Sequence, residues 1–305
     1  MEQKRLKNEI TQNWQVYIIL LPSVLYLVVF NYVPIYGILL AFKDFRPRLG
    51  IWGSSWVGFK YFMQFFSLNV FKQILWNTVA LSLYSLIAGF PLPVIFALAL
   101  NSFGYHKVKK IVQTVTYAPH FISTVVLVGM MNIIFSPSTG IVVNALHYLK
   151  ITDQPLMILT NPDAFRHLYV WSGIWASLGW NSIIYLGALS AVDPELHESA
   201  RVDGASKFRR IISIDFPSIL PTVMILLILN CGHIMNVGFE KVFLMQKSLN
   251  IRVSEIISTY TYKIGVQQGM FSLGTAIGLF NSVINFSLLL IVNKLARKFS
   301  NYSLW

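Results

Sequence analysis

Residues 193–217, DPELHESARVDGASKFRRIISIDFP, form a polar, charged island between long apolar runs. Asp193 is a good helix N-cap, and the proline after it fits the first helical position. Gly204 can take the left-handed conformation that ends this helix, and Ser206 can cap a second helix, which Pro217 would stop. The pattern predicts two short helices hinged at a glycine, a rigid shape that suits docking a partner. The alternative is an amphipathic helix whose arginines lie on lipid headgroups.

The composition indicates a membrane protein. Of 305 residues, 55% are hydrophobic and 12% are charged, and the mean hydropathy is +0.60. Soluble domains carry about a quarter charged residues. The net charge of +12 could indicate nucleic acid, but Lys and Arg occur in short blocks beside apolar segments, which fits membrane lipid better, so no nucleic-acid partner is expected. The single cysteine, Cys231, excludes an internal disulfide and is expected to be a packing residue.

Six apolar segments are long enough to cross a bilayer core, which needs about 20 residues per helix. They are 16–42, 74–100, 111–135, 168–192, 219–239 and 273–292. None alternates with a period of two, so all six are predicted to be helices. The first is too long for a signal peptide and has no small-residue cleavage site, so it is expected to be an uncleaved span.

The distribution of positive charge predicts the orientation. With the N-terminus inside, the inner segments hold 13 Lys and Arg residues in about 60 positions, whereas the outer segments hold 11 in about 100. Both termini and the segment 193–217 are therefore expected to face the cytoplasm.

The sequence lacks the residues that would make this chain an enzyme. It contains no Gly-Lys dipeptide, and therefore no P-loop, and no Cys/His cluster with zinc spacing. His120 and His233 lie in different spans without a nearby carboxylate in sequence. The six spans contain no Asp, Glu, Lys or Arg, whereas ion-coupled transporters usually keep such groups for the coupling ion. We therefore expect no catalytic residue, metal or cofactor in this chain. The energy for its function would come from another subunit.

Uncharged polar and aromatic side chains in the spans suggest a path for a neutral hydroxylated ligand such as a sugar. Aromatic rings cover the apolar face of a sugar, and amides bond its hydroxyls without burying a charge. The candidates are Trp175, Asn181 and Tyr185 in the fourth span, and Asn230, His233 and Asn236, which recur every three residues and are predicted to share one helical face in the fifth. The alternative is that these groups only bond and pack between helices.

The segment 193–217 resembles the cytoplasmic docking loop of bacterial ABC importer permeases. That pattern is Glu-Ala-Ala, three residues, Gly, nine residues, Ile, any residue, Leu-Pro. This chain has Glu198-Ser199-Ala200, Gly204, Ile214, Phe216 and Pro217 at the same spacing, with Ser199 and Phe216 as mild departures, and the Asp203-Gly204-Ala205 core of sugar-type members. Further blocks resemble the carbohydrate-uptake permeases, in particular the branch for large or acidic oligosaccharides: 19–23, 32–37, 41–45, 238–242, 258–265 and 275–280.

The resemblance implies an all-α integral membrane protein with the type I ABC importer permease fold, six transmembrane helices and a cytoplasmic N-terminus. Its parts would be residues 1–15 as a cytoplasmic N-terminus, 16–292 as the transmembrane domain containing the docking loop, and 293–305 as a cytoplasmic tail. The docking residues carried over are Glu198, Ala200, Asp203, Gly204, Ala205, Phe208, Ile211, Ile212 and Pro217. Glu198 would meet a basic residue of the ATPase, and Phe208, Ile211 and Ile212 would fill an apolar slot there.

The implied partners are a second homologous permease, two cytoplasmic ATPase subunits that bind ATP and Mg, and an extracytoplasmic solute-binding lipoprotein. The chain would thus be the bacterial plasma-membrane permease of an oligosaccharide importer, forming half of the pathway. A permease for amino acids or phosphate is the runner-up. An ion-coupled secondary transporter and an intramembrane enzyme are further alternatives, which the charge-free spans and the missing catalytic groups disfavour.

Overall fold

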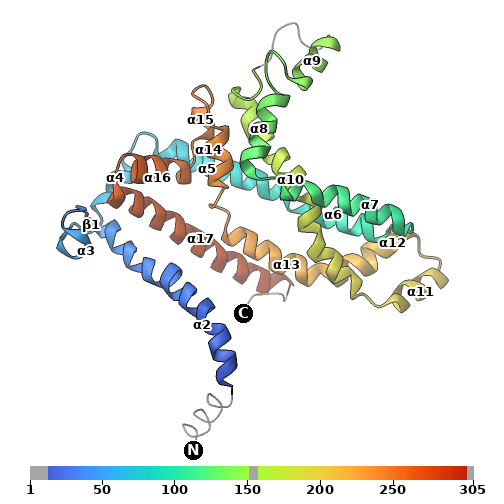
Figure 1. Ribbon diagram of the computed structural model, residues 1–305. Helices are drawn as coiled ribbons and strands as arrows, with labels where there is room; N and C mark the ends of the chain where they lie inside the picture. The colour runs from blue at the N-terminus through green and yellow to red at the C-terminus, as the bar shows by residue number, and fades with distance from the viewer. Residues whose placement is uncertain (1–12, 151–156, 301–305) are drawn as a thin grey trace, which may run out of the picture. The chain divides into compact units, whose positions relative to one another are not determined.

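The computed structural model describes residues 13–150 and 157–300, which are mostly helical (Figure 1). The chain divides into two units. One comprises Met1–Leu68 with Thr261–Phe280, and the other comprises Asn69–Tyr260 with Asn281–Trp305. Each unit is considered by itself below.

The first unit contains one long helix and a small cap. Its elements are α2 (Trp14–Leu27), the π-helix η1 (Val28–Tyr32), the 3₁₀ helix η2 (Val33–Phe42), β1 (Lys43–Asp44), α3 (Gly50–Gly53), β2 (Ser55–Trp56), α4 (Lys60–Phe66), η5 (Lys263–Gln267) and the start of α17 (Phe271–Ser300). The first three run as one helix, Trp14–Phe42, whose side chains are almost all exposed. The strands β1 and β2 form a short antiparallel pair, and Ser272 on α17 fastens it by accepting from the Phe45 N–H at 3.0 Å and donating to the Lys43 carbonyl at 2.6 Å.

The second unit contains most of the helices. They are α5 (Phe71–Gly89), α6 (Pro91–Asn101), α7 (His106–Tyr117), the 3₁₀ helix η3 (Ala118–Phe121), α8 (Thr124–Ile134), α9 (Ile141–Tyr148), α10 (Pro162–Ser190), α11 (Pro194–Val202), α12 (Lys207–Arg210), the π-helix η4 (Ile211–Asp215), α13 (Phe216–Gly232), α14 (Phe239–Met245), α15 (Ile251–Ser254) and most of α16 (Ile257–Tyr262). The remainder of α17 also belongs to this unit.

Helix α10 is the centre of the second unit. It packs along α6 and also contacts α5, α7, α13, η3 and α15 (Figure 1). Gly179 lets α7 approach closely, because a Cβ atom placed there would clash with the carbonyl oxygen of Thr116. Next to this contact, the His120 and Trp180 rings stack at 4.3 Å between centroids. Two apolar clusters pack around α10, one including Phe165 and Val170 and the other formed with α6 and α13.

The six predicted spans lie mostly on helices, but fewer than six of the described helices pass as membrane spans by length and composition. Four helices are long and apolar enough to cross a membrane: Trp14–Phe42, Phe71–Asn101, Lys207–Gly232 and Phe271–Lys298. A fifth is possible if the bent pair His106–Phe121 and Thr124–Ile134 is one span. The predicted fourth span, 168–192, lies on α10 as far as Ser190, and α10 is not one of these helices. The last helix continues past the predicted end at residue 292, through Ser300.

The third predicted span is not a straight helix. Its two halves meet at an angle of 98°. Pro119 lies in the 3₁₀ turn at the bend, and Ser123 starts a new helix by accepting a hydrogen bond from the Val126 N–H at 3.3 Å. The proline and the new N-cap account for the break.

The fifth predicted span is wrong at its end. Helix α13 stops at Gly232, and residues 233–238 are turns and extended chain rather than helix. The backbone there is bonded to α17 instead, since the Met235 N–H donates to the Asn285 side-chain oxygen at 3.0 Å. Asn230, His233 and Asn236 therefore do not share a helical face.

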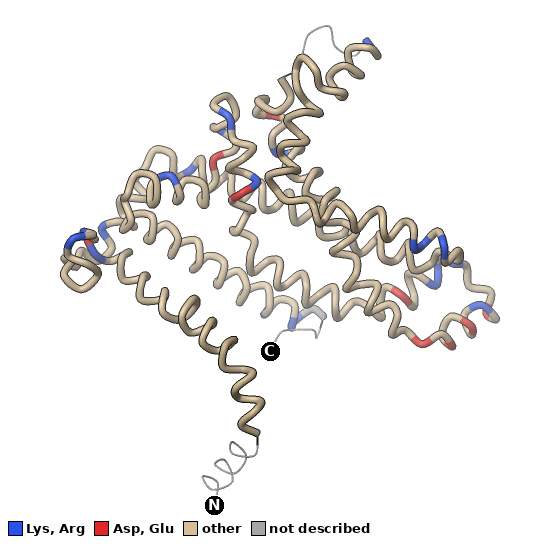
Figure 2. Tube along the Cα trace, in the orientation of Figure 1, with Lys and Arg blue, Asp and Glu red and all other residues tan. Residues whose placement is uncertain are grey.

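Charged residues gather at helix ends and in connections, and the middle of the long helices is uncharged (Figure 2). In the second unit, one such group covers the start of α7, α11 and α12. Large apolar side chains are exposed along the helices, for example Ile87 on α5 and Phe286 on α17. A protein surface of this kind fits lipid or a membrane partner rather than water.

Candidate functional site

The docking segment 193–217 is a helical hairpin, as its capping residues predict. The Asp193 carboxylate caps α11 by accepting from the Glu195 N–H at 2.9 Å, with Pro194 at the first helical position. The Ser206 hydroxyl caps α12 by accepting from the Arg209 N–H at 3.3 Å.

A glycine in the left-handed conformation joins the two helices. Gly204 has a φ of +76°. Its N–H donates to the Arg201 carbonyl at 3.0 Å, and the Ala205 N–H donates to the Ala200 carbonyl at 2.8 Å. These two bonds form a Schellman motif, which brings the residue after the glycine, Ala205, toward Ala200 in the last turn of the helix. The spacing of Ala200, Gly204 and Ala205 in the sequence thus has a direct conformational cause.

The prediction that Pro217 ends the second helix is wrong. Residues Lys207–Gly232 form one continuous helix. Proline lacks the N–H for the helical ladder, and its ring clashes with the carbonyl four residues back. The π-helix η4 removes this conflict, because the Phe216 N–H bonds the Ile211 carbonyl five residues back and Pro217 becomes an early residue of α13. The hairpin is therefore continuous with the helix that follows it.

A buried carboxylate fastens the hairpin to the helices behind it. The Asp215 side chain is 2% exposed, and its Oδ1 lies 3.2 Å from Nε2 of His197 on α11. Asn101, at the end of α6, donates to the same carboxylate oxygen at 3.5 Å. Three elements thus meet at one carboxylate, which fixes the direction of α11.

The outer surface of the hairpin combines apolar and acidic side chains. Phe208 is 71% exposed and Ile212 is 52% exposed. They are four residues apart and lie on one face, whereas Ile211 turns inward against the apolar cluster between α6 and α13. Glu198 and Asp203, on the same hairpin, are also exposed. Of the apolar trio predicted to fill a slot in a partner, Phe208 and Ile212 are available and Ile211 is not.

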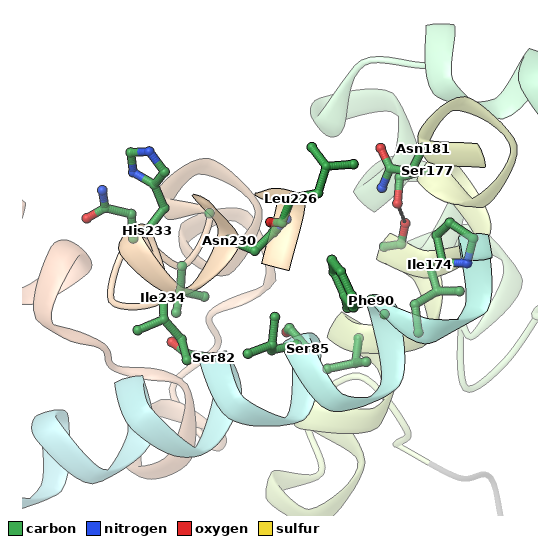
Figure 3. A pocket seen from close by; sticks show the side chains of 18 of the residues that line it. Ser82, Ser85, Phe90, Ile174, Ser177, Asn181, Leu226, Asn230, His233 and Ile234 are labelled. Carbon is green, nitrogen blue, oxygen red and sulfur yellow. Dashed lines mark hydrogen bonds between the residues drawn. The ribbon is translucent and has the colours of Figure 1, made fainter. Parts of the chain in front are cut away.

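A cavity of about 660 Å³ opens in the second unit between α5, α6, α10 and the end of α13. Figure 3 shows Ser177 and Asn181 on one wall, Asn230 and His233 on the opposite wall, and Ser85 with Phe90 along the helix between them.

Five of the six predicted sugar-path residues line this cavity: Asn181, Tyr185, Asn230, His233 and Asn236. The sixth, Trp175, does not line it and is half exposed on α10. Trp180, five residues further along the same helix, lines the cavity instead. Residues that point to one side of a helix recur every three or four positions, so Trp175 and Trp180 point to different sides.

Hydrogen bonds divide these residues into two kinds. The Asn236 side-chain oxygen accepts from the amides of Asn281 and Asn285 on α17, both at 3.0 Å, so it serves helix packing. The Asn230 amide donates to the Leu226 carbonyl of its own helix at 2.8 Å, and Asn230 lines the cavity.

One charged residue of the cavity wall was not predicted from the sequence. Lys241, on α14, is 9% exposed, and its Nζ donates to the Tyr169 carbonyl at 2.7 Å while lying 4.7 Å from the centre of the Tyr169 ring. Burial lowers the pKa of Lys241 to about 8, so the ammonium is charged at pH 7. The other titratable side chains of the cavity wall are Tyr169, Tyr185 and His233. Lys241 follows the predicted fifth span in sequence and was assigned to an outer loop, so only its tertiary contacts place it here.

A second polar group, the hydrogen-bond network around Asn77, could not be predicted from the sequence either. Asn77 on α5 donates to the carbonyls of Arg252 and Glu255 at 2.9 and 3.0 Å, and accepts from Arg166 on α10 at 3.1 Å. This network ties α5, α10 and α15 together. It involves residues far apart in sequence, and no motif marks it.

The chain is similar over nearly its whole length to two proteins of Bacillus subtilis (strain 168). It is 42% identical to Protein LplB of Bacillus subtilis (strain 168) over 95% of this chain and 90% of the relative. It is 38% identical to the polygalacturonan/rhamnogalacturonan transport system permease protein YteP of the same organism, covering 100% of this chain and 94% of YteP.

The chain is also similar over nearly its whole length to chains of solved structures. A chain from the crystal structure of a bacterial ABC transporter involved in the import of the acidic polysaccharide alginate matches with a TM-score of 0.89 and 38% identity, over 97% of this chain and 99% of that one. The same TM-score, at 37% identity, is found for a bacterial alginate ABC transporter in complex with alginate pentasaccharide-bound periplasmic protein, over 98% of this chain and 100% of that one.

The family model for the binding-protein-dependent transport system inner membrane component matches residues 12–301. The chain therefore belongs to this family of multi-pass ABC importer permeases and has their helical fold.

Proposed function

We propose that this chain is the permease subunit of an ATP-driven importer for oligosaccharides and forms half of the translocation pathway. The observation that carries the proposal is the full-length likeness, at a TM-score of 0.89, to a permease chain of an alginate importer. The cavity agrees with it, because aromatic, amide and hydroxyl groups line it together. A second homologous permease completes the pathway, and an extracytoplasmic binding protein delivers the substrate.

The hairpin 193–217 docks a separate ATPase subunit in this proposal. Exposed Phe208 and Ile212 on a charged loop have no reason to face solvent unless a partner covers them. The capped helices, the Gly204 hinge and the contact between Asp215 and His197 hold these side chains in a fixed arrangement. Preorganisation of this kind lowers the entropy cost of binding.

The continuous helix Lys207–Gly232 couples the hairpin to the cavity. Phe208 lies near one end of the helix, and Asn230 lies near the other end in the cavity wall. A helix of 26 residues is roughly 39 Å long, at about 1.5 Å per residue. When the ATPases close on nucleotide, movement of the hairpin is passed along this rod to the sugar path.

Transport in proteoliposomes tests the function. The chain is reconstituted with its second permease, its ATPase and its binding protein, and ATP hydrolysis is measured with oligogalacturonate, alginate oligosaccharides, amino acids or phosphate. We expect stimulation by an oligosaccharide-loaded binding protein and ATP-dependent uptake. Stimulation by amino acids or phosphate alone would instead support the runner-up solute classes, and uptake driven by an ion gradient without ATP would refute the proposal.

The orientation is a separate proposal, with both termini and the hairpin in the cytoplasm. Its support is the excess of Lys and Arg in these segments. Because Cys231 is the single cysteine, a Cys231→Ser background allows one cysteine to be placed at Ser199 in the hairpin or at Thr139 in the loop before α9. A membrane-impermeant maleimide applied to intact cells should label the second position and not the first. The opposite labelling would reverse the topology.

A further inference from the structure

The cavity contains one buried positive charge and no negative charge. Among the described residues that line it, Lys241 alone carries a formal charge at pH 7, and neither Asp nor Glu is present. No described carboxylate pairs with the Lys241 ammonium. Its contacts are the carbonyl and the ring face of Tyr169.

A buried ammonium with so few partners is unusual. Lysine is almost never fully buried unless it is paired, because removing the charge from water is costly. An ammonium has three N–H donors, and the structure gives one of them a protein acceptor, the Tyr169 carbonyl. Gly173 on α10 leaves room for the ammonium, since a Cβ atom placed there would lie 3.1 Å from Nζ. The site is thus shaped around a cation that its own protein partners do not neutralise.

The remaining polar groups of the cavity suit hydroxyls. Asn181 and Asn230 face each other across it in Figure 3, and His233 lies beside Asn230. The Ser85 hydroxyl oxygen, on the helix between the walls, is buried and has no hydrogen-bond partner among the described residues. A ligand that matches both features carries many hydroxyl groups and a carboxylate.

We propose that Lys241 binds the carboxylate of a uronic-acid unit in the cavity, and that it makes this permease prefer acidic over neutral oligosaccharides. The proposal rests on the oligosaccharide function proposed above and assigns selection by charge to the permease itself, in addition to any selection by the binding protein. A desolvated ammonium forms a charge-assisted hydrogen bond with a carboxylate, whereas a methyl ester at the same position offers no compensating charge.

The competing explanation is that Lys241 only links α14 to α10 through the Tyr169 carbonyl. The two roles separate in Lys241→Gln, which keeps an N–H donor for that carbonyl and removes the charge. They separate again in Lys241→Met, which removes both. Replacing a buried charge by an apolar side chain of similar volume is often neutral or stabilising, so this variant is expected to fold.

The experiment measures binding to the permease–ATPase complex in nanodiscs, with the binding protein omitted so that its own preference plays no part. The probes are an oligogalacturonate and the same oligomer with its carboxylates methyl-esterified, followed by isothermal titration calorimetry. Wild type is expected to bind the acid about tenfold or more tightly than the ester, as a charge-assisted hydrogen bond predicts. In both Lys241→Gln and Lys241→Met the ratio should fall to near one, while the affinity for the ester stays within about twofold of wild type. Lys247→Met, which removes an exposed lysine outside the cavity, should behave as wild type.

Three results would overturn the proposal. They are a wild-type complex that binds acid and ester equally or binds neither, a Lys241→Gln complex that keeps the preference for the acid, and a variant that loses both ligands to the same extent. Each leaves the transport proposal intact, because that is tested separately by ATP hydrolysis and uptake with the binding protein present. If oligosaccharide transport itself fails in that assay, the fault lies with the proposed function.

Discussion

The hinge of the docking hairpin gives the sharpest prediction, because Gly204 has room for a side chain but a backbone conformation that disfavours one. No atom lies within 4 Å of a Cβ placed at this position, so a Cβ meets no steric obstacle. The φ of +76° is nevertheless a conformation that L side chains rarely adopt. A substitution at Gly204 therefore acts through the backbone alone.

The magnitude follows from the left-handed conformation. Adding a Cβ there costs about 1–2 kcal/mol, which corresponds to about a 5–30-fold loss of the correctly bent hairpin. Gly204→Ala should show this loss, and Gly204→Val should show more, because a β-branched residue is a genuine outlier at positive φ. Gly204→Asn should remain close to wild type, since asparagine visits this region routinely.

The assay is retention of the ATPase on the affinity-purified permease, together with the ATPase activity of the complex. We expect the order Gly, Asn, Ala, Val from strongest to weakest, with thermal unfolding of the permease nearly unchanged because the hairpin is exposed. Gly104→Ala is the matched control, since that glycine also has free space around its Cβ position but no positive φ. Full ATPase binding by Gly204→Val, or a defect in Gly204→Asn as large as in Gly204→Val, would refute the reasoning.

Three further predictions concern packing, anchoring and pH. Gly179→Ala should lower the free energy of unfolding by about 1–3 kcal/mol, since its Cβ would meet the Thr116 backbone, while Gly187→Ala on the same helix has space and should be neutral or stabilising in the same thermal unfolding assay. Asp215→Ala should cost about 1–3 kcal/mol in that assay and reduce ATPase retention, and Asp215→Asn should cost less; no effect of either would show that the carboxylate does not anchor the hairpin. Lys241 has a pKa of about 8, so its charge is present at pH 7 and lost as the pH rises toward 9. Binding of oligogalacturonate should weaken over that range, and a flat profile would contradict the proposed role of the ammonium.

The hairpin could be predicted from sequence because its causes are local. An N-cap aspartate, a glycine at the hinge and a capping serine each act on backbone groups within a few residues. The capping bonds of Asp193 and Ser206 and the positive φ of Gly204 confirm these predictions. Pro217 was misread because the general rule, that proline stops a helix, assumes an α-helical ladder, which the π-helix η4 replaces.

The cavity could be predicted only in part. Hydropathy identified the helices that form it, and amide and aromatic residues in apolar runs identified five of its lining residues. The helical face proposed for Asn230, His233 and Asn236 was wrong because α13 ends at Gly232, after which the Met235 N–H bonds the Asn285 side chain of α17. Lys241 was missed because nothing near it in sequence indicates that Tyr169 receives its ammonium.

The two walls of the cavity differ in stiffness. On α10, backbone approaches backbone at Gly179, and the His120–Trp180 stack lies next to it, so this wall resists deformation. Opposite, residues 233–238 lack helical structure and are tethered through asparagine amides, which can exchange partners at little expense. Widening or narrowing of the passage should therefore be concentrated in residues 233–238, while α10 keeps its position.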